Sequence, residues 1–360
     1  MRTIGFSVYP AHAKLEENLA YIDRASKYGF KRVFTCLLSV EGEKEKIIDE
    51  FKKTVAHANQ YGMKVIADVD PSVFQHLGIS YDDLHIFKEM GLYGIRLDHG
   101  FTGLEEAAMS FNLFGLKIEL NMSAGTKYLD NIFSYQPNPD NLLGCHNFYP
   151  HKYSGISYDH FMKCNEQYKK FNIRTAAFVS SKSASFGPWP VNEGLCTLEK
   201  HRNLPIQVQA KHLFSTNLID DVIIANAFAS DEELKALSEV DPYKLTFHVH
   251  LEKNISDLER DIVLNRLHLN RGDVSEYMIR SSKSRVKYDG NGFAPVNTRN
   301  IKRGDITIDN MYYKNYTGEL QIALKDRENS GKTNVVGRIA DEELFLIDHV
   351  KPWQQFALVE

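Results

Sequence analysis

Two short segments of the sequence carry charged residues where a buried strand should be apolar. Residues 94–101 read GIRLDHGF and residues 115–123 read GLKIELNMS, so Arg96, Asp98 and Glu119 interrupt otherwise apolar runs. Carboxyl groups gathered at one site can divide acid and base work between them. This chemistry fits glycosidic hydrolysis, in which one acid protonates the leaving oxygen and one anion supports an oxocarbenium-like transition state. It equally fits proton abstraction by an isomerase or epimerase.

Apolar segments that could form strands recur eight times in the first two-thirds of the chain. They are residues 4–10, 32–38, 64–71, 94–101, 115–123, 142–150, 173–180 and 221–228. Segments with helical periodicity, such as residues 14–30 and 45–62, lie between them. Eight strands with mostly helical crossovers predict a (β/α)8 barrel of the TIM type. The competing doubly wound sheet lacks its usual nucleotide-binding signs, since no GxGxxG segment follows the first strand and no Walker sequence occurs.

The sequence pattern changes after about residue 241. Short strand-like segments follow, such as GDITIDNM, GELQIALK and TNVVGRIA, with turn residues between them. This pattern is typical of a small all-β domain. We therefore expect a catalytic barrel at residues 1–243 and a β domain at residues 244–360.

Polar residues of the predicted barrel strands share one parity along each strand. The set comprises Ser7 and Tyr9 on the first strand, Asp68 and Asp70 on the third, Arg96 and Asp98 on the fourth, and Glu119 and Asn121 on the fifth. Side chains of one parity point into a closed barrel, and barrel enzymes build their sites at the carboxyl ends of the strands. A satisfied ion-pair network, with Arg96 bound to Asp98 or Asp68, would also explain single members of the set. Three neighbouring strands with the same feature at one end favour an active site.

Two further segments belong to the same end of the predicted barrel. The sixth strand ends in CHNFYP, and a connection of about forty residues separates the seventh strand from the eighth. Connections of this length in compact domains are often lids or binding loops. The predicted substrate-binding residues from these segments are Asn147, Tyr149, Glu193, Glu199, His201 and Arg202.

Composition excludes several classes of protein. The 43 basic and 47 acidic residues give a net charge of −4 without a sustained Lys/Arg run, which argues against a nucleic-acid partner. No window approaches the roughly 18 apolar residues of a membrane span, and the N-terminus lacks the apolar core of a signal peptide. The four cysteines have no CxxC spacing and fit reduced thiols. We therefore predict a cytoplasmic protein without a membrane partner. Because HExxH and EF-hand sequences are absent, we expect neither metal nor cofactor, and the absence of GxSxG argues against a hydrolase serine elbow.

Motifs spread over the whole chain resemble one bacterial family. In chain order they read GFSVYP, ADVDPSVFQHLG, GIRLDHGF, IELNMS, CHNFYP, EGLCTLEKHR, GDITIDNMYYKNYTGELQI and NVVGRI. Together they resemble the MupG-type 6-phospho-N-acetylmuramidases. The resemblance implies a TIM-type barrel followed by a small cyclophilin-like β-barrel domain. It also implies a glycoside hydrolase that cleaves 6-phospho-N-acetylmuramyl-N-acetylglucosamine, a phosphorylated amino-sugar disaccharide, in peptidoglycan recycling.

The resemblance implies roles for matching residues. Glu119 and Asp98 would be the two working carboxylates, with Glu119 as the general acid and Asp70 as a third candidate. The chain departs from the family at Phe186, where members typically carry an arginine before Gly-Pro. A 6-phosphate needs cationic or N–H partners. The remaining candidates are Arg96, Lys182 and Arg202 in the barrel, and Arg299 and Arg303 in the second domain.

Two other functions stay open at this point. A sugar-phosphate isomerase or epimerase would use the same barrel and the same carboxyl groups. A non-catalytic sugar-phosphate-binding protein would need anion contacts but only one poised carboxylate.

Overall fold

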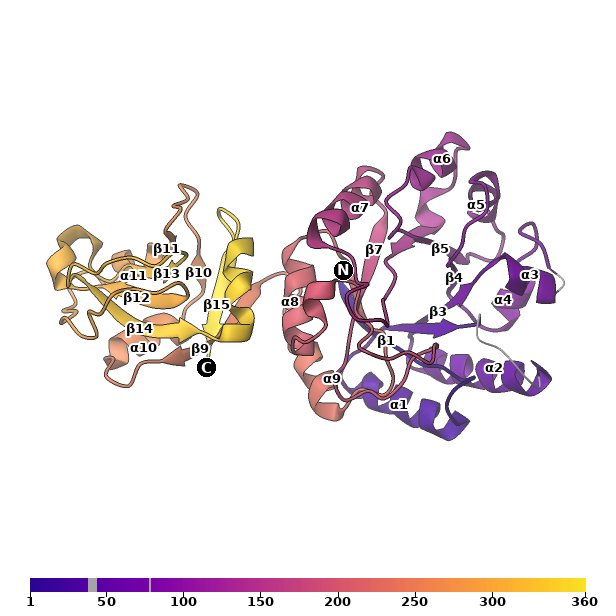
Figure 1. Ribbon diagram of the computed structural model, residues 1–360, viewed down its shortest axis with the longest axis horizontal. Coiled ribbons are helices and arrows are strands. Elements are labelled where there is room, and N and C mark those ends of the chain that lie inside the picture. The colour runs from indigo at the N-terminus through magenta and orange to yellow at the C-terminus, as the bar shows by residue number, and fades with distance from the viewer. Residues whose placement is uncertain (38–43, 78) are drawn as a thin grey trace. The chain divides into compact units, whose positions relative to one another are not determined.

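The computed structural model describes residues 1–37, 44–77 and 79–360. Within these ranges the chain divides into two compact units, residues 1–239 and residues 240–360 (Figure 1). Among the helices of the described ranges, none combines the length and the apolar character that crossing a membrane requires.

The first unit is a closed barrel of eight parallel strands, arranged around the barrel in sequence order. The strands are β1 (Thr3–Ser7), β2 (Arg32–Cys36), β3 (Lys64–Val69), β4 (Gly94–Leu97), β5 (Lys117–Asn121), β6 (Leu142–Cys145), β7 (Arg174–Val179) and β8 (Asp221–Ile224). Pairing of β8 with β1 closes the barrel. The predicted TIM-type barrel is confirmed. Leu38, the last residue of the second predicted strand, lies outside the described residues.

Helices in the connections surround this barrel (Figure 1). They are α1 (Leu15–Lys27), α2 (Lys44–Gln60), α3 (Pro71–Leu77), α4 (His85–Glu89), α5 (Leu104–Met109), α6 (Tyr128–Ser134), α7 (Tyr158–Lys170), α8 (Ile206–Ser215) and α9 (Asp231–Ser238), with 3-10 turns η1 (Pro139–Asn141) and η2 (Glu199–His201). The first helix shows why they form here. It buries Asn18, Tyr21, Ile22 and Ala25, which lie on one face at helical spacing. Gly29, with φ of 77°, follows its end in the left-handed conformation.

Strand register places the charged residues of β3, β4 and β5 on one face of the sheet. Asp68 pairs with Arg96, and Arg96 pairs with Glu119. Residues paired in register on neighbouring parallel strands project to the same side, and the next residues along each strand project to the other. The intervening Leu97 and Leu120 are fully buried apolar residues of that other face. The strands therefore carry both an apolar layer and a polar one.

The second unit is built on a seven-stranded sheet in the order β10-β15-β9-β14-β12-β13-β11. Its strands are β9 (Leu245–Leu251), β10 (His268–Leu269), β11 (Met278–Ser281), β12 (Asp305–Asp309), β13 (Leu320–Ala323), β14 (Thr333–Ile339) and β15 (Gln355–Val359). Its helical segments are α10 (Asp257–Leu264), α11 (Lys283–Lys287), η3 (Met311–Tyr316) and η4 (Asp341–His349). The pairings are antiparallel except that of β15 with β9. The predicted order, an α/β barrel followed by a β domain, is confirmed.

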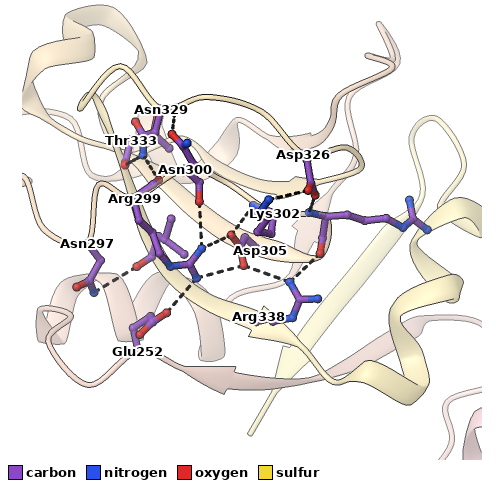
Figure 2. Close-up of polar contacts among 12 residues, drawn as sticks. Glu252, Asn297, Arg299, Asn300, Lys302, Asp305, Asp326, Asn329, Thr333 and Arg338 are labelled. Atoms are coloured by element: carbon purple, nitrogen blue, oxygen red, sulfur yellow. Dashed lines mark hydrogen bonds and ion pairs between the residues drawn. The ribbon is translucent and has the colours of Figure 1, made fainter.

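The buried carboxylate of Asp305 organises one end of this sheet (Figure 2). Arg299 Nη1 donates a hydrogen bond to Asp305 Oδ2 at 2.6 Å, and its Nη2 donates to Glu252 Oε1 at 3.1 Å. Arg303 Nη2 donates to Asp348 Oδ2 at 2.8 Å. Arg299 and Arg303, the two candidate phosphate contacts of the second domain, are thus both paired with carboxylates of their own unit.

Candidate active site

Arg96 organises the carboxyl-terminal end of the barrel. Its buried guanidinium donates from Nη1 to Asp68 Oδ1 at 2.6 Å and to Asp98 Oδ1 at 3.1 Å. Its Nη2 donates to Asn147 Oδ1. Three strand ends, those of β3, β4 and β6, therefore meet on one side chain. The two carboxylates bond the same nitrogen, so their nearest oxygens lie no further apart than the sum of 2.6 Å and 3.1 Å.

The two carboxyl groups that meet at Arg96 have different surroundings. Asp68 is 6% exposed, and burial raises its pKa to about 7 although the charge of Arg96 lowers it. The negative charge of neighbouring Asp98 raises the pKa of Asp68 further. Asp98 has a side chain that is 25% exposed. Neighbouring carboxyls in unlike environments are the usual basis for separate acid and base roles.

Two amides and a tyrosine surround these carboxyl groups. Asn121 Nδ2 donates to the carbonyl oxygen of Asp98 at 3.0 Å, and its Oδ1 accepts from the N–H of Ser123 at 3.1 Å. The backbone N–H of Asn147 donates to Ser123 Oγ at 2.8 Å. Tyr149 is partly buried, and this burial raises its pKa. The structure therefore brings four predicted residues, Asp98, Asn121, Asn147 and Tyr149, to this end of the barrel.

Asp70 begins helix α3. Its Oδ1 accepts hydrogen bonds from the N–H of Ser72 at 2.8 Å, from Ser72 Oγ at 2.5 Å and from the N–H of Val73 at 3.1 Å. Partial burial alone would raise the pKa of Asp70, but these bonds outweigh it and hold the pKa below its ordinary value. One oxygen is thus committed to capping the helix. The catalytic role of Asp70 stays a prediction.

Glu119 lies inside the barrel. It is fully buried, and its Oε1 accepts a hydrogen bond from Arg32 Nη2. Arg32 is the first residue of β2, and its Nη1 donates at 2.9 Å to Asp221, the first residue of β8. This ion-pair group lies toward the amino-terminal ends of the strands. Within the described ranges, no hydrogen bond joins Glu119 to Asp98, and Glu119 Oε2 has no hydrogen-bond partner. The general-acid role of Glu119 stays a prediction.

Ser7 and Tyr9, the predicted residues of the first strand, donate hydrogen bonds to the backbone at the end of β8. Ser7 Oγ donates to the carbonyl oxygen of Ile224 at 2.7 Å, and the Tyr9 hydroxyl donates to that of Ala225. Both side chains are buried, and burial raises the pKa of Tyr9. The ring of Phe186 packs edge-on against Tyr9 and against Phe228, with centroids 6.4 Å and 5.3 Å apart. At the position where a family arginine was expected, this chain builds an apolar cluster.

Arg202 stabilises the connection between β7 and β8 through hydrogen bonds. Its Nε and Nη2 donate to the two oxygens of Glu199 at 2.7 Å and 2.6 Å. Its Nη1 donates to the carbonyl oxygens of Tyr149 at 2.9 Å and Gly194 at 2.7 Å. The hydrogen bonds from Arg202 lower the pKa of Glu199 to about 2. The ion pair of Arg202 and Glu199 therefore positions the backbone at Tyr149, and the charge of Arg202 is already bound by protein groups.

The other two predicted residues of this connection lie apart from the carboxyl pair. His201 is buried, its Nε2 lies 2.7 Å from His212 Nδ1, and burial lowers its pKa to about 3. Glu193 is exposed and accepts at Oε2 from the N–H of Lys152 at 3.0 Å. Their predicted substrate contacts stay predictions. Within the described part of the chain, no group of three His, Cys, Asp or Glu side chains could hold a metal ion.

A closed parallel barrel that gathers carboxyl, amide and phenol groups at the carboxyl ends of its strands has the architecture of the TIM-barrel class. The chain belongs to the 6-phospho-N-acetylmuramidase family. The N-terminal part of this family matches residues 4–239, and its C-terminal part matches residues 245–359. The resemblance predicted from the sequence motifs is confirmed, and the name of the family describes a glycosidase.

Two solved structures extend the comparison. The crystal structure of an uncharacterized B. cereus protein is 50% identical, with a TM-score of 0.94, and the match covers 100% of this chain and 99% of that one. A conserved Enterococcus faecalis protein of unknown function is 26% identical, with a TM-score of 0.74 and coverage of 99% and 96%. No curated protein matches the chain significantly. Both units of the chain therefore recur together in other bacterial proteins.

Proposed function

We propose that the protein hydrolyses 6-phospho-N-acetylmuramyl-N-acetylglucosamine during peptidoglycan recycling. The observation that supports this most directly is the pair Asp68 and Asp98, joined by Arg96 at the active end of the barrel in a member of this family. Such a pair supplies the two carboxyl groups that glycosidic cleavage needs.

The surroundings of the two carboxyl groups suggest their roles. Asp68, whose pKa burial raises to about 7, is partly protonated near neutral pH and would donate a proton to the leaving oxygen. Asp98, the more exposed of the two, would stabilise the oxocarbenium-like transition state. Asp68 Oδ1 and Asp98 Oδ1 lie no further apart than the sum of their distances from Arg96 Nη1, 2.6 Å and 3.1 Å. This upper bound is compatible with the roughly 5–5.5 Å carboxyl spacing of retaining enzymes, whereas inverting enzymes have roughly 6.5–9.5 Å. Retention would follow whether Asp98 attacks or orients the 2-acetamido group of the substrate.

The 6-phosphate needs a cation other than Arg96 or Arg202, because both are occupied by protein partners. Barrel enzymes often bind phosphate with the loop after the seventh strand. Here the N–H groups of Lys182 and Ser183 already donate to the carboxylate of Glu233, at 2.7 Å and 3.4 Å. The side chain of Lys182 is exposed and has no ion-pair partner in the described ranges. We therefore assign the phosphate contact to the Lys182 ammonium group.

The purified protein is expected to cleave the phosphorylated disaccharide and to leave its unphosphorylated twin intact. Mass spectrometry of both reactions measures this directly. Equal cleavage of the two would reject the phosphate specificity. Cleavage of neither by folded protein would reject the proposed hydrolysis and favour an isomerase or a sugar-phosphate-binding protein.

The rate of cleavage is expected to fall above about pH 7, because Asp68 then loses the proton that it must donate. The relevant measurement is kcat/KM against pH for the native chain and for Asp68→Asn. The variant should lose about 10²–10³-fold in turnover and show no decline centred near pH 7.

Ionisation of Asp68 also lowers the stability of the fold, because the pKa of Asp68 is raised in the folded state. The contribution of protonated Asp68 to the free energy of unfolding is fully present below the ordinary pKa of an aspartate and is lost as pH rises through about 7. Unfolding in urea should therefore be followed over the same pH range. A decline near pH 7 that persists unchanged in Asp68→Asn would remove the acid role from this residue.

A further inference from the structure

The second unit contains a cavity of about 400 Å³, formed by residues of this unit alone. Its lining comes from β11, β12, β13, β14, η3 and the connections next to them. Two of its residues, Asn329 and Thr333, are labelled in Figure 2, where Asn329 Nδ2 donates to the carbonyl oxygen of Thr333. This volume lies within the range of small-molecule sites, about 300–1,000 Å³.

A row of polar side chains crosses the sheet at this cavity. Gln321 on β13 lies opposite Arg280 on β11 and opposite Thr307 on β12, while Asp309 on β12 lies opposite Thr333 on β14. Gln321, Thr307, Asp309 and Thr333 are buried. Buried polar groups cost free energy unless they are hydrogen-bonded, and apolar residues would stabilise a sheet face at least as well. Ile306 and Ile308, which alternate with Thr307 and Asp309, provide that apolar face on the other side of the sheet.

Asp309 forms part of the floor of the cavity. Its Oδ2 accepts from Gln321 Nε2 and its Oδ1 from Thr333 Oγ1, both at 2.8 Å. Both donors are neutral, and burial raises the pKa of Asp309 to about 7. A carboxyl group held in this way is a good acceptor for sugar hydroxyl groups and carries less than a full negative charge near neutral pH.

Arg327 is a cation in the lining of the cavity. Its Nη2 donates to Gln321 Oε1 and its Nη1 to the carbonyl oxygen of Tyr277, each at 3.1 Å. No carboxylate in the described ranges forms an ion pair with it, and burial lowers its pKa. By contrast, Arg280 and Arg285 both pair with buried Glu319, at 2.6 Å and 3.2 Å. Of the charged residues that line the cavity, Arg280 is thus held by Glu319, whereas Arg327 and the exposed Glu328 form no ion pair in the described ranges.

Two tyrosines of η3 border the cavity. Tyr313 and Tyr316 are 40% and 45% exposed, and their ring centroids lie 6.1 Å apart. The guanidinium of Arg285 lies over the ring of Tyr316 at 5.3 Å. Exposed aromatic faces beside hydrogen-bonding groups can pack against the C–H face of a sugar ring.

We propose that this cavity binds a small anionic carbohydrate, with a sugar phosphate as the chemical class that fits best. Arg327 binds the anionic group, Asp309 accepts from ring hydroxyls, and Tyr313 and Tyr316 cover the apolar face of the ring. The site is formed by residues of the second unit, and the proposal does not depend on the function proposed for the barrel.

Calorimetric titration of the full chain tests this site. The probes are N-acetylglucosamine 6-phosphate and uncharged N-acetylglucosamine. The phosphorylated probe should bind the native chain at least about 10-fold more tightly than the uncharged one, as expected for charged hydrogen bonds. Arg327→Met should remove that advantage, and Arg327→Lys should retain most of it. Lys325→Met removes an exposed cation, paired with Glu276, from outside the cavity and should change nothing. Tyr316→Ala, a substitution at a partly exposed ring, should weaken binding without affecting the fold.

Equal binding of the two probes, or unchanged binding in both Arg327→Met and Tyr316→Ala, would overturn the assignment. Loss of binding in Asp98→Asn with no effect in Arg327→Met would place the bound sugar phosphate in the barrel and would also overturn it. Disaccharide cleavage is measured in parallel with every variant. Because it depends on the barrel carboxyl groups, its failure in the native chain would reject the proposed function and leave the binding result to be judged separately.

Discussion

Asp98→Asn is expected to lower kcat for the phosphorylated disaccharide by about 10³-fold, with KM changed by less than about tenfold. Asparagine keeps the shape and the Oδ1 acceptor that Arg96 contacts, so the ion-pair group should stay assembled. What it removes is the negative charge that would stabilise the developing oxocarbenium ion. Steady-state kinetics with the phosphorylated disaccharide, combined with urea unfolding, separates loss of chemistry from loss of fold.

Asp82→Asn is a matched control for this substitution, because Asp82 is exposed and, among the described residues, its side chain forms no hydrogen bond, while its N–H donates to Ser80 Oγ. It should keep kcat within about twofold, as expected for a surface change. Asp70→Asn is the informative comparison, because asparagine keeps the Oδ1 acceptor and begins a helix about as well as aspartate, so it should leave α3 intact and spare most of the activity. If Asp98→Asn retained kcat within tenfold while Asp70→Asn lost it, Asp70 would take the role assigned to Asp98.

The barrel could be predicted because apolar alternation and strand spacing determine it locally. The predicted strands were nevertheless longer than the paired ones. Residues 94–101 were expected as one strand, but β4 ends at Leu97, and β6 ends at Cys145 rather than near residue 150. Beyond Leu97 the chain bends at Asp98 and His99. Asp98 and Asn147 lie just after the ends of β4 and β6 and are only partly buried, which leaves them accessible to a substrate.

The alternation of residues along each strand predicted which side chains face the barrel interior. It did not predict at which level along the barrel axis these side chains meet. Strands tilt in a closed barrel, so residues paired in register lie at different levels. Arg96 therefore contacts Asp68 and Asp98 near the active end, while Glu119, its register partner, meets Arg32. Arg32 shares its parity with Phe34 and Cys36, and this pattern could have identified it. Nothing in the spacing of Glu199 and Arg202 revealed that Arg202 would bind distant backbone carbonyls, because those contacts arise only from the folded path of the loop.

Arg32→Met is expected to destabilise the barrel by about 3–5 kcal/mol, the usual cost of leaving a buried charge without its partner. Glu119 would lose the hydrogen bond at Oε1 while remaining fully buried. Asp221 would keep Arg174, which donates to it at 2.5 Å and 2.9 Å. Arg174→Met is the matched control. Its side chain is 34% exposed and Asp221 retains Arg32, so we expect a loss of about 1 kcal/mol. Hydrogen exchange of barrel peptides in urea reports on this unit separately from the second one.

Glu119→Gln then decides between a structural and a catalytic role for Glu119. Glutamine keeps an acceptor for Arg32, so stability should fall by only about 1–2 kcal/mol. Combined with Arg32→Met, it should recover part of the lost stability, because no charged Glu119 remains unpaired. If Asp68 and Asp98 are the working pair, Glu119→Gln keeps kcat within about tenfold. A 10³-fold loss of kcat in a stably folded variant would instead assign the acid role to Glu119, as its sequence motif predicts. The unpartnered Oε2 of Glu119 would then be the atom that carries the proton, and substrate would have to reach deeper into the barrel than the position of Arg96.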